Sequence, residues 1–138
     1  MITFQAAEQY MMYRKALLFS DTQTASQILQ AHEPAEQKQL GRKVRNFDRK
    51  VWDREKLKIV EEGNFWKFSD VDAGKIRRWL LETGERELIE ASSDDRIWGV
   101  GFLPENAEAN RSHWGQNLLG IALMGVRKRI REQEAAST

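Results

Sequence analysis

The 138-residue sequence contains no cysteine and only two histidines, and these absences restrict the chemistry that the chain can perform. Without thiols, the chain can form neither disulfides, thiolate nucleophiles nor cysteine-based zinc sites. His32 and His113 are too few for a histidine-rich metal site. We therefore expect no metal and no cofactor. The lack of cysteine and of an N-terminal signal pattern also leads us to expect a cytoplasmic, intracellular protein.

The sequence also lacks an excess of charge of one sign and any long apolar run. Its 22 basic and 21 acidic residues give a formal charge of +1. No general field attracts nucleic acid or an anionic membrane, so an anionic ligand must be held by a few local groups. No apolar run approaches the roughly 20 residues that a membrane-spanning helix needs. We expect neither membrane association nor strong general binding of nucleic acid, and the oligomeric state stays open.

What the sequence does contain is a composition typical of a globular protein. Hydrophobic residues make up 41% of the chain, with five tryptophans and six phenylalanines. The length corresponds to one domain, since domains usually have roughly 100–200 residues. We predict a single domain over residues 1–138, with residues 132–138 as a frayed tail.

Helical patterns cover most of this chain. The expected helices span residues 3–19, 22–31, 34–41, 48–63, 69–84 and 116–133. Asp21 and Asp48 are predicted N-caps, whereas Gly63 and Gly84 are predicted to end their helices. Only residues 85–92 and 97–102 are candidates for strand. The predicted fold is therefore mainly α, with at most a small strand element.

Charged residues interrupt an apolar stripe on the first expected helix. Phe4, Glu8, Met11, Lys15 and Phe19 follow a helical spacing and share one face. Glu8 and Lys15 lie roughly 10 Å apart along the axis, too far to pair directly but suited to flank a small ligand. The alternative is that both lie at the rim of the stripe and extend into water.

The stretch SSDDRIWGVG, at residues 92–101, places acids next to an indole. Together with Glu90, the acids Asp94 and Asp95 beside Trp98 are candidates for a general acid and base, a pair that can hydrolyse glycosidic bonds. The alternative is an ordinary capped turn, because Ser and Asp favour turns and glycine allows a positive φ. The local pattern favours the turn.

The start of the last expected helix is a third candidate. Gln116 or Asn117 is placed to cap it, and its N-terminal amides are then available for a phosphate or a sugar edge. Capping without a ligand is the alternative. Arg42, Lys43 and Arg45 are interpreted as a solvated face, although they are also able to meet a phosphate.

Taken together, these segments resemble the NADAR family, also called the YbiA-like family. The matching segments occur in the family's order and cover nearly the whole chain. They are AAEQYMMYRKALLF, GRKVRNF, LLETGERELIEAS, DDRIWGVG and WGQNLLGIALMGVR. Family members usually begin with an additional N-terminal segment that contains an F-S-N-F-like motif, whereas this sequence begins close to its first helix.

The resemblance implies a mainly helical fold and hydrolysis of N-glycosidic bonds. Two substrate classes are implied, namely ADP-ribosylated guanine and the ribosylaminopyrimidine phosphates of the riboflavin pathway. The alternative is a non-catalytic module that binds ADP-ribose or a related nucleotide. By position, the family's pocket residues fall on Glu8, Lys15, Glu90, Asp95, Trp98 and Asn117, and the glycines of its turns fall on Gly99, Gly101 and Gly120.

These positions lead to expected roles. The catalytic set would be Asp95 and Glu90 as the main carboxylates, Glu8 as a third, and Lys15, which would hold the sugar or attack the opened ribose as a Schiff-base nucleophile. The substrate-binding set would be Trp98, Asn117, Gly99 and Gly101. Of the two adjacent acids, the resemblance makes Asp95 the candidate for chemistry and Asp94 the residue that caps the turn.

Overall fold

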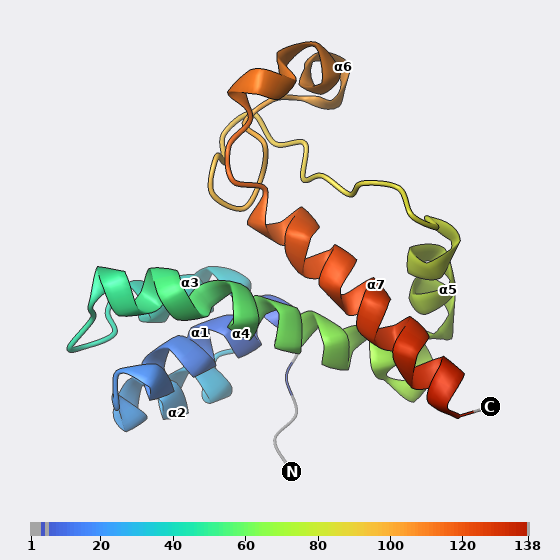
Figure 1. Ribbon diagram of the computed structural model, residues 1–138. Helices are drawn as coiled ribbons and strands as arrows, with labels where there is room; N and C mark the ends of the chain where they lie inside the picture. Colours follow the sequence, from blue (N-terminus) through green and yellow to red (C-terminus); the bar gives the residue numbers. More distant parts are fainter. Residues whose placement is uncertain (1–3, 5, 138) are drawn as a thin grey trace. The chain divides into compact units, whose positions relative to one another are not determined.

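A computed structural model describes residue 4 and residues 6–137, and this part of the chain is helical without any strand (Figure 1). The mainly α prediction is confirmed, whereas residues 85–92 and 97–102 are irregular. The elements are α1 (Ala7–Leu18), α2 (Thr22–Gln30), α3 (Pro34–Arg42), α4 (Arg49–Ser69), η1 (Val71–Ala73), α5 (Gly74–Glu82), α6 (Pro104–Ala107), η2 (Glu108–His113) and α7 (Leu118–Ala136). The chain divides at Gly63 into two compact units, which are described separately.

The first unit is built on α1, which packs against both α2 and α3. Its core consists of small and medium apolar side chains together with one phenylalanine. They are Met12, Ala16, Phe19, Ala25, Ile28 and Val44. Buried amide side chains satisfy backbone groups at the edge of this core, since Gln9 Nε2 donates to the carbonyl of Ile28 at 3.1 Å.

A buried aspartate connects two segments of this unit. Asp21 caps α2 as predicted, because its carboxylate accepts a hydrogen bond from the Thr24 amide at 3.1 Å. The same carboxylate accepts from the backbone amide and the guanidinium of Arg45, both at 2.9 Å. These bonds hold the pKa of Asp21 well below its ordinary value, with the Arg45 guanidinium as the largest cause. Asp21 therefore ties the start of α2 to the connection between α3 and α4.

Two predicted helix ends in this unit are wrong. The first helix begins at Ala7, so Phe4 precedes it and does not share its face; residues 3 and 5 lie outside the described residues. Gly63 does not end α4, which continues to Ser69. A Cβ atom at Gly63 would lie 2.7 Å from Cδ1 of Tyr10, so the glycine makes room for a ring. Asp48 is confirmed as an N-cap, since its carboxylate accepts from the Lys50 amide at 2.9 Å.

The second unit has its own core, formed by Phe68, Leu80, Val126 and Ile130. Gly84 follows α5 with a φ of +66°, as its predicted role requires. Residues 132–136 belong to α7. The reason is local, because the Glu and Ala residues of this segment are strong helix formers.

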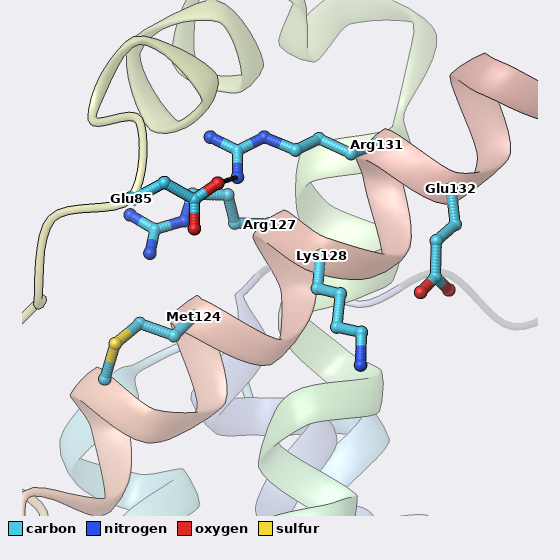
Figure 2. Close-up of a pocket in the computed structure, with 6 residues that line it drawn as sticks. All are labelled: Glu85, Met124, Arg127, Lys128, Arg131 and Glu132. Carbon is cyan, nitrogen blue, oxygen red and sulfur yellow. Dashed lines mark hydrogen bonds and ion pairs between the residues drawn. The ribbon is translucent and has the colours of Figure 1, made fainter.

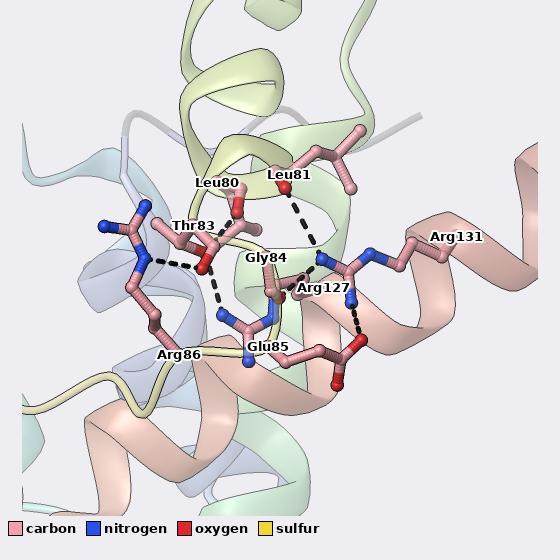
Figure 3. Close-up of polar contacts among 8 residues, drawn as sticks. All are labelled: Leu80, Leu81, Thr83, Gly84, Glu85, Arg86, Arg127 and Arg131. Atoms are coloured by element: carbon pink, nitrogen blue, oxygen red, sulfur yellow. Dashed lines mark hydrogen bonds and ion pairs between the residues drawn. The ribbon is translucent and has the colours of Figure 1, made fainter.

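Two arginines of α7 hold the C-terminal end of α5 (Figure 3). Arg127 donates to the hydroxyl of Thr83 at 2.7 Å, and Arg131 donates to the carbonyls of Leu81 and Gly84. The last carbonyls of a helix lack partners within it and carry partial negative charge. Cations from the neighbouring helix therefore satisfy and stabilise this end of α5. Within the described ranges, no helix is long and apolar enough to cross a membrane.

Candidate active site

The acidic loop and the start of α7 are joined by a set of backbone hydrogen bonds. Five consecutive amides, from residues 115 to 119, donate to carbonyls of residues 96–100 over distances of 2.7–3.1 Å. Among them, the Leu118 and Leu119 amides bond to the carbonyls of Ile97 and Trp98. These are the first amides of α7, so the expectation that they are available to a phosphate is wrong. Carbonyls of the loop occupy the place that an anion would take.

Asn117 precedes α7 in a left-handed conformation with a φ of 53°, and its side chain does not cap the helix. Its Oδ1 accepts from the Glu90 amide at 2.9 Å, and its Nδ2 donates to the Leu88 carbonyl at 3.0 Å. The residue is only 6% exposed. The amide group therefore holds the segment that carries Glu90, and Asn117 thereby positions a candidate catalytic carboxylate.

Gly99 allows the backbone carbonyls of Glu90 and Asp95 to lie close to it. A Cβ atom at this position would lie 2.7 Å from the Glu90 carbonyl oxygen and 2.9 Å from that of Asp95. Only glycine avoids these collisions. Gly99 does not have a positive φ, whereas Gly101 does, with a φ of +82°. Glycine is therefore required at the two positions for different reasons: the close approach of backbone atoms at Gly99, and the positive φ at Gly101.

Gly120 belongs to the same arrangement, because a Cβ atom there would collide with the Leu88 carbonyl and lie 2.4 Å from Asn117 Nδ2. Trp98 is half-buried, and its amide and carbonyl are both hydrogen-bonded. In the second unit the structure thus brings together Glu90, Asp95, Trp98, Gly99, Gly101, Asn117 and Gly120.

Asp95, not Asp94, caps the acidic turn. Oδ1 of Asp95 accepts from the amides of Ile97 at 2.9 Å and Trp98 at 2.8 Å. Asp94 is exposed, and its carboxylate has a contact of 3.5 Å with the Ser93 hydroxyl. The predicted assignment of the turn cap to Asp94 is therefore wrong. Capping fixes the direction of the Asp95 carboxylate, and among the described residues no hydrogen bond reaches its Oδ2.

Lys15, in the first unit, is surrounded by aromatic and cationic groups. Its ammonium lies 4.8 Å from the ring centroid of Phe47 and 5.5 Å from that of Trp52, an arrangement typical of cation–π contacts. Burial lowers the pKa of Lys15, and the nearby guanidinium groups of Arg49 and Arg42 lower it further. No carboxylate of the described chain forms an ion pair with Lys15. This half-buried amine is therefore more easily deprotonated than an ordinary lysine.

The neighbours of Lys15 are not predictable from the sequence. On the sequence alone, Arg42 is interpreted as part of a solvated face, and there is no reason to single out Arg49. In the structure, Arg42 ends α3 and Arg49 begins α4, so the two flank the connection between these helices. Glu8 is exposed and forms an ion pair of 3.6 Å with Lys38. As expected from their spacing, Glu8 and Lys15 are not paired.

A separate pocket of about 420 Å³ lies along α7 (Figure 2). It contains none of the expected site residues, and two of its arginines are engaged with α5 and the residues that follow it. Its lining consists of Glu85, Met124, Arg127, Lys128, Arg131 and Glu132. Across residue 4 and residues 6–137, no cluster of three or more His, Asp or Glu side chains is arranged to hold a metal ion.

Comparison of the sequence with known proteins identifies the family of this chain. Residues 1–131 match the NADAR domain. An N-glycosidase of Acanthamoeba polyphaga mimivirus is 43% identical over 91% of this chain and 74% of its own length. An N-glycosidase of Nostoc punctiforme is 36% identical over 90% of this chain and 72% of its own length. A riboflavin biosynthesis protein of Vibrio vulnificus is 29% identical over 87% of this chain and 30% of its own length. The chain therefore belongs to the NADAR domain family.

Proposed function

We propose that this chain is a hydrolase that cleaves the N-glycosidic bond of a ribose carrying phosphate. Relatives named N-glycosidases support the type of reaction, and a relative named a riboflavin biosynthesis protein supports a ribosylaminopyrimidine phosphate as one substrate class. ADP-ribosylated guanine is the other proposed class, because it also contains an N-linked ribose with phosphate groups. Both classes are anionic and carry a planar base.

The observation that carries this proposal is the environment of Lys15. A half-buried amine with two guanidinium neighbours and no carboxylate partner among the described residues favours an anionic ligand. The rings of Phe47 and Trp52 offer flat apolar surfaces beside it. The lowered pKa increases the fraction of neutral amine, the form that attacks a carbonyl carbon.

The reaction requires a proton on the leaving nitrogen and a water molecule at the anomeric carbon. When the C–N bond breaks, its electron pair passes to the base nitrogen, which takes a proton from a carboxylic acid. Water adds to the anomeric carbon and loses a proton to a carboxylate. We assign these two tasks to Asp95 and Glu90, with Glu8 as a third carboxylate. In a covalent variant, the Lys15 amine adds to C1 of the ring-opened riboside, and the C–N bond to the base then breaks as the base nitrogen takes a proton and the Lys15 imine forms. Water hydrolyses this imine, which releases the ribose and restores the amine.

The test is a hydrolysis assay on both substrate classes with variants and matched controls. Asp95→Asn keeps the oxygen that caps the turn but removes the titratable group, and Asp94→Asn changes the exposed neighbour. Lys15→Ala is compared with Lys58→Ala, which alters an exposed lysine of α4. We expect turnover to fall at least tenfold in Asp95→Asn and Lys15→Ala and to stay at the wild-type level in both controls.

Equal turnover by wild type and Lys15→Ala would refute the role of this lysine. Reduction with borohydride during turnover gives a further readout, because a Lys15 imine becomes a stable secondary amine that mass spectrometry locates. The absence of that adduct while hydrolysis proceeds would exclude the covalent variant.

A non-catalytic module that binds ADP-ribose is the second candidate function. Two expected site residues favour it, because the side chains of Asp95 and Asn117 form hydrogen bonds to the backbone. Calorimetry with ADP-ribose separates the candidates. Binding by wild type without release of base from either substrate class would establish the module and refute the hydrolase.

A further inference from the structure

The connection between α3 and α4, residues 43–48, controls what surrounds Lys15. Phe47 lies in this connection, and Arg42 and Arg49 flank it. The centroid of the Phe47 ring lies 4.8 Å from the Lys15 ammonium nitrogen and 5.7 Å from Cζ of Arg49. The charged groups that act on the Lys15 amine are Arg49 and Arg42, and both are cationic. Whatever holds this connection in place therefore also sets the environment of the amine.

Asp21 holds the connection through Arg45. Its carboxylate is buried, with 1% of the residue exposed, and it binds both the backbone amide and the guanidinium of Arg45. The Asp21 amide in turn donates to the Ala16 carbonyl in the last turn of α1, the helix that carries Lys15. Asp21 thus connects the helix of the lysine to the loop of its aromatic neighbour.

The path of the loop between these anchors leaves little freedom. Val44 is buried in the core of the first unit, and Asn46 has a left-handed conformation with a φ of 62°. The Phe47 ring then packs edge-on against Phe19, with 5.3 Å between centroids. A shift at Arg45 would therefore pass within two residues to Phe47 and within four to Arg49.

We infer that Asp21 is a positioning residue for the proposed reaction, which acts through Arg45 to hold Phe47 and Arg49 beside Lys15. The inference rests on the proposed function only for its catalytic consequence. Charge-assisted hydrogen bonds to a buried carboxylate are strong and meet little competition from water. An asparagine has nearly the same shape, but it loses the charge and can present an NH₂ group to the donors of Arg45.

The decisive measurement needs no substrate. The lysines of the full chain are reductively methylated with ¹³C, and the Lys15 resonance is assigned by its absence in Lys15→Arg. We expect Asp21→Asn to raise the titration midpoint of Lys15 toward that of an ordinary lysine, because the amine becomes better hydrated and Arg49 moves away. Asp70→Asn is the matched control, since Asp70 also caps a helical turn but lies in the second unit.

An unchanged Lys15 midpoint in folded Asp21→Asn would overturn the inference. If circular dichroism shows that this variant does not fold, Arg45→Ala replaces it, because this change removes the guanidinium and keeps the backbone amide on Asp21. A smaller shift in the same direction is then expected, and no shift would overturn the inference equally.

The catalytic consequence is measured separately. We expect kcat/KM of Asp21→Asn to fall at least fivefold and the limb of the pH profile that reports Lys15 to move to higher pH. If wild type hydrolyses neither substrate class, the proposed function fails, while the titration of Lys15 still decides whether Asp21 is a positioning residue.

Discussion

Replacement of Asn117 tests whether one side chain holds the acidic loop against the start of α7. Asn117→Ala removes two hydrogen bonds, one from the Glu90 amide at 2.9 Å and one to the Leu88 carbonyl at 3.0 Å. It also places an alanine at a φ of 53°, a conformation that asparagine tolerates better than alanine. Both effects destabilise the folded state.

The expected loss of stability can be added from these parts. Each hydrogen bond contributes about 1 kcal/mol net. The left-handed conformation costs alanine roughly 1 kcal/mol more than asparagine. The free energy of unfolding should therefore fall by about 3 kcal/mol in Asn117→Ala. Asn117→Gly loses the same bonds but accepts the positive φ, so its expected loss is about 2 kcal/mol.

Urea unfolding followed by circular dichroism measures these differences. Asn110→Ala is a suitable control, because Asn110 makes one side-chain bond, to the Asn106 carbonyl at 2.8 Å, and has a negative φ. Its expected loss is about 1 kcal/mol. If Asn117→Ala is no less stable than Asn110→Ala, the side chain does not hold the loop and our assignment is refuted.

Two further predictions concern the first unit. Gly63→Ala should lose about 1–3 kcal/mol by overpacking, because the added Cβ would lie 2.7 Å from a ring atom of Tyr10. Gly74→Ala, in the second unit, is the control: the nearest atom to its added Cβ is 3.7 Å away, so urea unfolding should show little change or a small gain. The pKa of Asp21 in the folded state lies below 3.8, the ordinary value that we take for the unfolded state. Asp21 therefore stabilises the fold fully at a pH above 3.8, and this stabilisation is lost as the pH falls below that value toward the folded pKa. Acid unfolding should show this loss in wild type but not in Asp21→Asn; the same acid sensitivity in both would contradict the assignment.

The sequence predicts the start or end of a helix correctly where only neighbouring residues determine it. Asp21 and Asp48 cap helices as predicted, and Gly84 has the positive φ that its place after a helix requires. Each depends on a few neighbouring residues. Gly63 misleads because the same residue type also provides room for a contact, here with Tyr10. That contact joins residues 53 positions apart, and periodicity contains no information about it.

The candidate site shows the same division between local and long-range causes. The sequence identifies SSDDRIWGVG as a capped turn near acids, which is correct, but it cannot say which acid does the capping. Asp95 accepts from the amides of Ile97 and Trp98, in a turn that also brings Gly99 against the Glu90 carbonyl. Likewise, the guanidinium groups of Arg42 and Arg49 act on Lys15 only because the fold brings the end of α3 and the start of α4 near this residue of α1.

The start of α7 shows what tertiary structure adds to a sequence rule. A helix N-terminus is a general anion site, because its first amides lack partners within the helix. Here the carbonyls of Ile97 and Trp98 accept from those amides, so the site is filled by the chain itself. In the proposed reaction, recognition of a phosphate would then fall to side-chain cations. We expect Lys15 to provide it together with its two arginine neighbours, since none of the three forms an ion pair with a carboxylate in the described part of the chain.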